Sequence, residues 1–442
     1  MSTTNQSRTV RRLSVFLSFL LAFGVMTMLP TPAYAEEEYV CMIGDVGYTD
    51  IDEAIKRAND WDTIKLVTDV EKTTSVEIME DLSNGHLAIY SAAIFINGRS
   101  LTVDTNGYVF SVGKQIQIDK GLSATYNPPM WTYGLRVING GELNLIDSSV
   151  ERTGQFNISG YCAVSVFGSG SKATVSNTIA FSTYAQHSYS GVFAADGGII
   201  TILGDVRGGK SSAARAINGG VISIEGSVIS DADTTLYAAE KDSSIVVYGD
   251  VVNTVTGNSA NFVITAEEGA SIKVNGSVRS DSSHGVIADG ENTTVEIKGN
   301  LTADQGTGVQ AVDGAKVTID GVLTASNYVK LGTSSDKTML YEKESAVISQ
   351  SNPGYYEYSD SVNHVYVKSD GSIINTKVGA PGSGDLFGRG TVTMDVSLLA
   401  ARAVIGIGMN LSIEQFAAFD MDLDGALTMI DVTLILQKAC GL

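Results

Sequence analysis

The sequence predicts an all-β fold, a solenoid of the parallel β-helix type, followed by a small all-α module. A twelve-residue phrase returns six times between residues 197 and 325, and its apolar residues alternate with polar ones as they do in strands. Each copy has a glycine in its eighth place, and successive glycines are 22, 23, 27, 23 and 22 residues apart. These glycines are Gly204, Gly226, Gly249, Gly276, Gly299 and Gly321.

Each phrase, with the residues before it, describes one coil of the solenoid. An alternating strand, as in Ile272-Lys273-Val274, leads to the glycine, where we expect a tight bend through positive φ, because only glycine enters that region without steric cost. A second strand follows the glycine, and a third apolar pair such as Val286/Ala288 precedes each phrase. Coils must stack to bury their inward faces. A leucine-rich repeat has a similar period, but its leucine and asparagine positions are absent.

Residues 1–35 are predicted to be an export signal. Three arginines precede an apolar run over residues 13–28, and Ala-Tyr-Ala at 33–35 fits the small-x-small cleavage rule. No second apolar run of spanning length follows, so we expect a secreted protein without a transmembrane anchor. Removing the signal changes the net charge from −20 to −23, because it contains three arginines and no acidic residue.

The acidic composition limits the classes of partner. A strongly negative chain repels nucleic acid and anionic membrane surfaces, whereas its carboxylates suit calcium binding outside the cell. The three cysteines, Cys41, Cys162 and Cys440, are odd in number and far apart, which excludes a disulfide framework. Cys162 falls in a strand pattern and is expected to be a small buried residue.

Residues 36–70 are predicted to be an N-terminal cap with the order strand, helix, strand. Ile51, Ala54, Ile55 and Ala58 share one face of the helix. A solenoid needs such a cap, because its end would otherwise expose strand edges and core to water.

The stretch from Cys41 and the later LTVDTNGYVFSV from Leu101 carry a resemblance to a known group. They are similar to segments that open many pectate-lyase-like β-helices of bacterial surface proteins. The resemblance covers roughly residues 40–367 and implies a right-handed parallel β-helix, here over 71–367, but its motifs are architectural and carry no catalytic residues.

An aromatic strip is predicted in the longer coils between residues 120 and 196. Tyr133, Tyr161 and Tyr189 are each 28 residues apart and should stack at strand separation, ~5 Å. With Trp131 they would form a platform for sugar rings. A structural ladder of aromatic rings is the other interpretation, and it is favoured because aromatic rows commonly stabilise stacked strands.

The repeat ends before a closing segment, residues 326–367, which we expect to form a hairpin or terminal coil. Its alternating apolar residues are Tyr356, Tyr358, Val365 and Val367. Turn formers and low hydrophobicity then predict a linker over residues 368–384.

Residues 385–442 contain the pattern DMDLDGALTMID, which resembles an EF-hand calcium loop. Oxygen atoms at alternate places of a tight loop surround a hard cation, and Gly425 permits the sharp turn. A helix, 432–436, is expected to begin after the last carboxylate. The predicted calcium ligands are Asp420, Asp422, Asp424, the Ala426 carbonyl, Thr428 through water, and Asp431.

A second copy lies upstream, since DVSLLAAR from Asp395 matches DVTLILQK from Asp431 place for place. Two such units at the end of a secreted chain resemble a type I dockerin, which implies binding to a cohesin domain of a scaffold protein in a carbohydrate-degrading assembly. The first loop, from Asp385, is one residue short and has Phe387 and Arg389 at ligand places, so we expect it to bind calcium weakly or not at all.

Three functions are open at this point. The first is a secreted, non-catalytic β-helix that is displayed through its dockerin-like module and binds glycan or another surface. The second is a polysaccharide lyase or glycoside hydrolase, and the third is a structural spacer. Catalysis by hydrolysis needs paired carboxylates and uronate lyases need a base, yet no catalytic residue is identified and the four histidines share no spacing. Asp196, Asp289 and Asp313 stand beside glycine, where turns favour aspartate. Binding or display is therefore preferred to catalysis.

Overall fold

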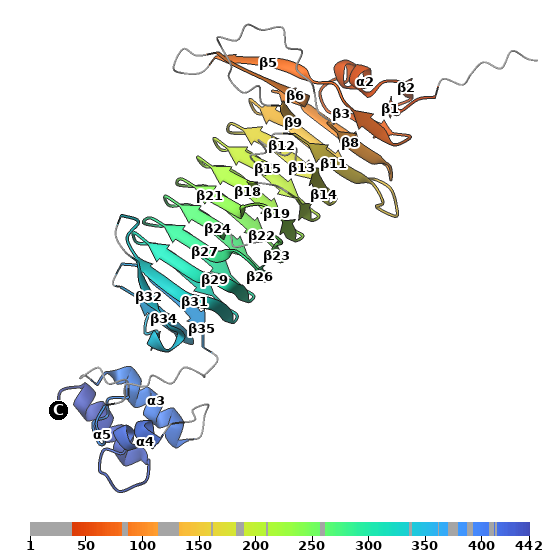
Figure 1. Ribbon diagram of the computed structural model, residues 1–442. Helices are drawn as coiled ribbons and strands as arrows, with labels where there is room; N and C mark the ends of the chain where they lie inside the picture. The colour runs from red at the N-terminus through yellow and green to blue at the C-terminus, as the bar shows by residue number, and fades with distance from the viewer. Residues whose placement is uncertain are drawn as a thin grey trace, which may run out of the picture.

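The computed structural model is mostly β, with strands stacked into a long, nearly closed solenoid and three helices near the C-terminus (Figure 1). The predicted export signal lies outside the described residues. The structure describes residues 38–81, 87–113, 132–160, 162–182, 190–208, 211–256, 261–335, 338–360, 362–369, 379–386, 392–405, 411 and 413–442.

One side of the solenoid is a sheet of 15 strands whose main body is parallel. Each strand pairs with the equivalent strand of the coils before and after it. The parallel strands are β3 (Asp62–Leu66), β7 (Ser100–Asp104), β10 (Glu142–Ile146), β13 (Lys172–Val175), β16 (Ile199–Ile202), β19 (Val221–Ile224), β22 (Ser244–Val247), β25 (Ser271–Val274), β28 (Thr294–Ile297), β30 (Lys316–Ile319) and β35 (His364–Lys368).

The remaining two sides form one sheet of 20 strands, because β29 (Leu301–Val312) and β31 (Leu323–Gly332) run through both. The first row is β4 (Val70–Lys72), β8 (Val109–Val112), β11 (Gln155–Ser159), β14 (Ile179–Ser182), β17 (Val206–Arg207), β20 (Val228–Ser230), β23 (Val251–Asn253) and β26 (Val278–Ser280). The second row is β6 (Leu87–Asn97), β9 (Thr132–Ile138), β12 (Cys162–Phe167), β15 (Ser190–Ala195), β18 (Ser212–Ile217), β21 (Thr234–Ala239), β24 (Phe262–Glu267) and β27 (His284–Asp289). The predicted solenoid of stacked, parallel strands is therefore confirmed.

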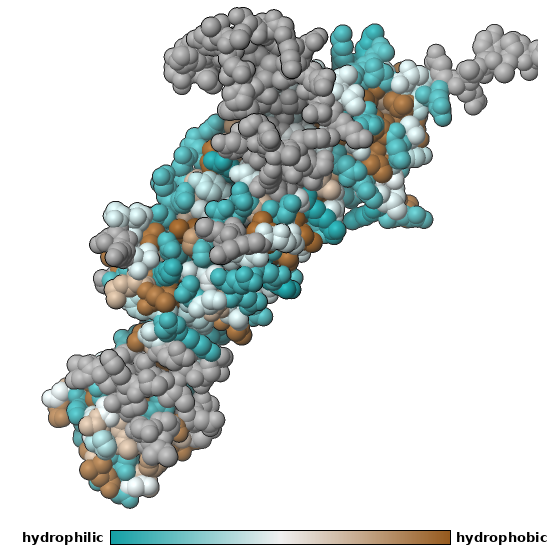
Figure 2. Space-filling view, in the orientation of Figure 1, coloured by the Kyte–Doolittle hydropathy of each residue, from teal (hydrophilic) through white to brown (hydrophobic). Residues whose placement is uncertain are grey.

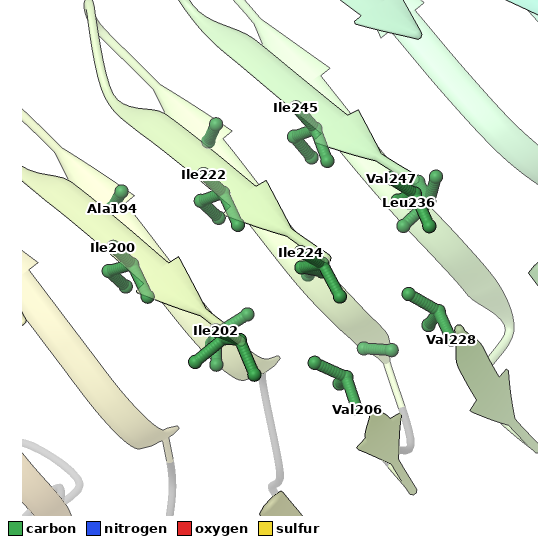
Figure 3. Packing of buried hydrophobic residues seen from close by; sticks show 14 of the residues in the cluster. Ala194, Ile200, Ile202, Val206, Ile222, Ile224, Val228, Leu236, Ile245 and Val247 are labelled. Carbon is green, nitrogen blue, oxygen red and sulfur yellow. The ribbon is translucent and has the colours of Figure 1, made fainter. Parts of the chain in front are cut away.

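The interior is filled by rows of equivalent apolar residues from successive coils. Ile200, Ile222 and Ile245 are level with one another in the strand register, and all three are fully buried. Figure 3 shows this row and the neighbouring one through Ile202 and Ile224, pointing into the same space. Stacking buries one inward face after another, which is why the repeat is stable only as an array.

The strand register agrees with the predicted alternation. Val278 is 1% exposed and belongs to the main core cluster, whereas Lys273 is part-exposed and its Nζ lies 3.2 Å from a carboxylate oxygen of Glu296 in the next coil. Inward valine and outward lysine follow from the two-residue period of a strand.

The expected reason for the repeated glycines is wrong. All six are described by the structure, and none has a positive φ. Each instead lies against its counterpart in the coil before: a Cβ on Gly226 would lie 2.5 Å from the Gly204 carbonyl oxygen, and one on Gly249 would lie 2.6 Å from that of Gly226. Glycine is required because stacked backbones approach closely at this corner, leaving no room for a side chain.

Positive φ occurs at a different corner. Asp196 and Gly197 have φ of 54° and 80°, and Asp313 and Gly314 have 53° and 93°. Two consecutive residues with positive φ form a tight turn in which aspartate followed by glycine is favoured. These two aspartates therefore have a structural reason for their positions, as the sequence suggested.

A row of polar side chains follows the glycine row. The side chain after each glycine except the last accepts a hydrogen bond from the backbone N–H of its counterpart one coil on. Ser227 N donates to Asp205 Oδ1 at 2.9 Å, and Asp250 N donates to Ser227 Oγ at 3.1 Å. The row continues through Ser277 and Asn300 and ends at Val322. Side chains thus supply the acceptors for backbone donors at this corner.

The N-terminal end is covered by the predicted cap. β1 (Cys41–Ile43) pairs antiparallel with both β2 (Val46–Tyr48) and β3, and α2 (Ile51–Arg57) packs Ile51 and Ala54 into the main core cluster. β5 (Val76–Asp81) pairs antiparallel with β6. The open end of the core is therefore closed by antiparallel strands and one short helix.

The C-terminal end is closed by a hairpin, as predicted. β34 (Tyr355–Ser359) pairs antiparallel with β35, which is itself the last parallel strand of the first sheet. β32 (Met339–Tyr341) pairs antiparallel with β31. A 3-10 helix follows over Lys343–Ser345, and β33 (Val347–Ile348) then pairs antiparallel with β34. The four alternating residues of the predicted hairpin are all buried: Tyr356, Tyr358, Val365 and Val367.

The C-terminal unit is helical and has its own core. Its helices are α3 (Met394–Val404), α4 (Ile413–Phe419) and α5 (Met429–Ala439). Val396 and Val432, which hold matching places in the two sequence copies, both belong to the core of this unit. The backbone N–H of Gly382 donates to Ala417 O at 2.8 Å, so contacts of the unit begin upstream of residue 385.

Candidate functional site

The loop between α4 and α5 brings three acidic side chains together. Asp420 follows α4, Asp422 lies in the loop, and Asp431 lies in the first turn of α5. One carboxylate oxygen of each lies within 4.8 Å of those of the other two. Asp420 and Asp431 are buried, while Asp422 is exposed, so the group is open to solvent on one side.

Backbone donors fix Asp420 at the start of the loop. Its Oδ1 accepts from Asp424 N at 3.1 Å and its Oδ2 accepts from Gly425 N at 2.9 Å. Leu423 and Gly425 have φ of 58° and 84°, and these left-handed residues turn the chain back towards Asp420. The expected sharp turn at Gly425 is therefore present.

Asp424, a predicted ligand, lies outside the group of three carboxylates. Its Oδ1 accepts a hydrogen bond from Ala426 N at 2.8 Å. The Thr428 hydroxyl, another predicted ligand, lies 3.2 Å from Asp431 Oδ2. Of the predicted calcium ligands, the structure brings Asp420, Asp422 and Asp431 to one place.

Asp431 is held from both sides. Its Oδ1 accepts from Met421 N at 2.7 Å, and its Oδ2 accepts from Thr428 N at 2.8 Å. Thr428 is the N-cap of α5 and forms a capping box with Asp431, so the helix begins at Met429. The predicted start at Val432 is therefore three residues late, because threonine followed three residues later by aspartate caps the helix before it.

The charges of the loop affect one another. Desolvation raises the pKa of Asp422, and the neighbouring charges of Asp424, Asp431 and Asp420 raise it further. Burial opposes ionisation of Asp431, but the hydrogen bonds from Thr428, Met421 and Asp422 outweigh it and lower its pKa. Carboxylates this close repel one another, and a bound cation would relieve the repulsion.

Only part of the first loop lies within the described residues. Asp385 is buried and its backbone N–H donates to Ser383 Oγ at 3.1 Å. Asp395 lies in α3. Phe387 and Arg389 lie outside the described residues, so the predicted weakness of the first loop stays a prediction.

Of the four residues predicted to form the aromatic strip, one, Tyr133, lies within the described residues. Tyr133 is 5% exposed and belongs to a small buried cluster with Ile78, Ala92 and Cys162. The Arg136 guanidinium lies 4.7 Å from the centre of its ring. This ring has little surface left for a sugar, and its surroundings suit a structural role. Trp131, Tyr161 and Tyr189 lie outside the described residues.

The pairing of the strands does not follow the equal 28-residue spacing of the three tyrosines. Leu135 is level with Val164, which is level with Val192. The first step is therefore 29 residues and the second 28. Tyr133 consequently lies level with Cys162, with which it shares a cluster. A shift of one residue moves a side chain to the other face of a strand.

Cys162 is fully buried, as expected of a small strand residue. Burial raises the pKa of its thiol to about 12. Cys41 is also buried and Cys440 is exposed, and all three thiols are free.

None of the described helices has the length and apolar character needed to cross a membrane. The chain matches no family model, no curated protein and no solved structure.

Proposed function

We propose that the chain is an exported right-handed β-helix protein that a calcium-dependent, dockerin-like module attaches to a cohesin domain of a scaffold protein. The solenoid would act in glycan binding or in surface display within a carbohydrate-degrading assembly. The observation that carries the proposal is the group of three carboxylates, Asp420, Asp422 and Asp431, which lie within 4.8 Å of one another where the loop after α4 meets the first turn of α5.

The donor set suits calcium better than a transition metal. The three gathered side chains offer only oxygen atoms, and hard cations such as Ca²⁺ prefer carboxylate and carbonyl oxygens. Asp420, Asp422 and Asp431 would hold the ion directly, and Asp424 and the Ala426 carbonyl are the further predicted ligands. Binding would neutralise the repulsion between the carboxylates and thereby stabilise the unit.

The surface of the helical unit supports a protein partner. Met394 and Leu398 on α3 are more than half exposed, as are Met429 and Ile430 on α5. α3 and α5 lie in contact, so these apolar side chains belong to one small unit, whose surface includes hydrophobic residues in Figure 2. Exposed apolar side chains on a small unit are compatible with a surface that binds another protein.

The solenoid supports binding or display more than catalysis. Two histidines in the described strands have structural partners: His284 Nδ1 accepts from Thr307 N at 2.7 Å, and His364 Nδ1 lies 2.9 Å from a Glu357 oxygen. Lyase or glycoside hydrolase activity is the alternative function, and a structural spacer is the third.

The calcium proposal is tested on the full mature chain after treatment with chelator. We expect calorimetry to detect calcium binding, and we expect an immobilised cohesin domain to retain the chain with calcium and release it with chelator. Asp422→Asn should weaken both, because it removes one charge from the group without adding bulk. Asp281→Asn, on an exposed aspartate of the solenoid, is the control and should change neither. Capture that persists in chelator would contradict the proposal.

A further inference from the structure

The outer surface of the first row of the second sheet contains a step between two coils. Residues 147–154 connect β10 to β11, whereas residues 176–178 connect the equivalent strands of the next coil, β13 and β14. The longer connection projects beyond its neighbour, and Val150 in it is fully exposed. The shorter one leaves open the space beside it.

A small residue deepens this step into a groove. In the outward row of the sheet, Asn157 is level with Ala180, and Ala180 is level with Arg207. The short side chain of Ala180 therefore lies between two longer ones. The resulting groove has a volume of about 650 Å³, and residues that line it include Arg152, Gln155, Asn157, Asn177, Thr178 and Arg207.

Hydrogen bonds to a buried carboxylate hold the wall of the groove in place. Asp147 Oδ2 accepts from Gly154 N at 2.7 Å and from Asn177 Nδ2 at 3.1 Å. Its Oδ1 accepts from Gly107 N in the preceding coil at 2.8 Å. Asn177 Nδ2 also donates to Gly154 O at 2.8 Å, which joins the projecting connection to the shorter one. The groove is therefore formed before any ligand arrives.

The chemistry of the lining points to a particular kind of ligand. Arg152 and Arg207 both line the groove in a chain whose net charge is −20, and the Arg207 guanidinium also pairs with Asp205 at 2.9 Å. Guanidinium groups match carboxylate and sulfate groups in shape and charge. The amides of Gln155, Asn157 and Asn177 offer both donors and acceptors, which suit the hydroxyls of a sugar.

We infer that this groove binds an anionic saccharide, with Arg152 and Arg207 on its carboxylate or sulfate groups and the amides on its hydroxyls. The inference rests on the proposed glycan-binding role and gives it a place and a ligand class. Among the described residues that line the groove, none has a large apolar side chain that could anchor a peptide. The negative charge of the rest of the chain disfavours densely charged nucleic acid.

The chain contains a matched control for Arg207. Arg207 lies 2.9 Å from Asp205, two residues before it, and Arg279 lies 2.9 Å from Asp281, two residues after it. Both arginines are more than half exposed and lie in the same outward row, which passes from Arg207 through Ile229 and Val252 to Arg279. They differ in that Arg207 lines the groove.

The experiment measures binding of the full chain to a uronic-acid hexasaccharide, to a sulfated hexasaccharide and to the uronate hexasaccharide with its carboxyl groups reduced to alcohols. We expect Arg152→Gln and Arg207→Gln each to weaken binding of an anionic saccharide by about tenfold or more, and Arg279→Gln to leave it unchanged. The first two hexasaccharides distinguish carboxylate from sulfate as the group recognised. Thermal melting of each variant shows whether it is folded.

The inference would be overturned by binding to neither anionic saccharide, by equal affinity for the reduced saccharide, or by an equal effect of Arg279→Gln. Inorganic sulfate that competes as well as the saccharide would reduce the site to one for simple anions and would also contradict it. Asp422→Asn separates this inference from the calcium proposal, because it should impair capture by cohesin and leave saccharide binding intact.

Discussion

Gly226 lies directly against Gly204 of the coil before it, so close that a Cβ on Gly226 would be 2.5 Å from the Gly204 carbonyl oxygen. Gly226→Ala should therefore destabilise the protein although its φ suits alanine. Forcing a methyl group against a fixed backbone costs about 1–3 kcal/mol, which urea denaturation can measure. Glu225→Ala, on the exposed residue before it, is the control and should change stability little. Equal stability of both variants would show that the coils can separate at this corner without cost.

The register of the strands predicts opposite outcomes at Val278 and Lys273. Val278 is buried in the main core, and burial of such a side chain contributes roughly 1.5–3 kcal/mol. Val278→Asp should lower the melting temperature sharply, because it also introduces a buried charge without a partner. Lys273→Asp changes only a part-exposed ion pair and should have a small effect. Similar melting temperatures for the two variants would contradict the register.

Acidification should weaken the projecting connection of the groove through Asp147. Burial opposes ionisation of this carboxyl group, but hydrogen bonds from Ser149, Gly154 and Asn177 outweigh it and lower its pKa from 3.8 to about 2. The carboxylate therefore stabilises the fold above its unfolded pKa, and this contribution is lost as the pH falls through the folded value.

The Asp147→Asn variant measures that contribution. It should be less stable than the natural chain at pH 7 by roughly 2 kcal/mol, and the difference should shrink between about pH 4 and pH 2. Denaturant titrations at several pH values provide the comparison. A difference that does not change with pH would show that the loss comes from packing and not from charge.

Calcium should bind to the second loop of the helical unit. We expect calorimetry on the full chain to give about one ion per chain, because the first loop has Phe387 and Arg389 at ligand places. Asp424→Ala should weaken binding on the order of tenfold, because we expect this side chain to turn towards the ion when calcium binds. Asp385→Ala is the comparison in the first loop and should not alter the affinity. Two equally tight sites would contradict this prediction.

The inward residues of the strands could be predicted because the two-residue period reports them directly, as at Val278. The repeated glycines were recognised, but their cause was not. Glycine is needed at positions with positive φ and also at positions where two backbones approach closely. The sequence alone does not distinguish these two causes. Gly226 belongs to the second kind and Gly197 to the first.

The meeting of Asp420, Asp422 and Asp431 agrees with the predicted pattern, but spacing alone does not determine it, because Asp424 belongs to the same pattern and lies outside the group. The neighbour of Tyr133 could not be predicted from the spacing of the tyrosines. The step between the two coils is one residue longer than that spacing, which places Tyr133 beside Cys162. The groove at Arg152 and Arg207 was missed for the same reason: it depends on how coils of unequal length lie against each other. The unusual length of residues 147–154 was the signal that could have indicated it.

Because of the polar side chains that follow the repeated glycines, a single coil cannot be removed or added without changing which of these side chains are neighbours. Aspartate and serine alternate at Asp205, Ser227, Asp250 and Ser277, and each accepts a hydrogen bond from the next backbone. Excising the one coil that contains Ser227 would place Asp205 and Asp250 on consecutive levels, where two carboxylates repel each other. Excising two consecutive coils would restore the alternation. Shortening or lengthening this solenoid, by protein engineering or by gene duplication, should therefore succeed more readily in steps of two coils than in steps of one.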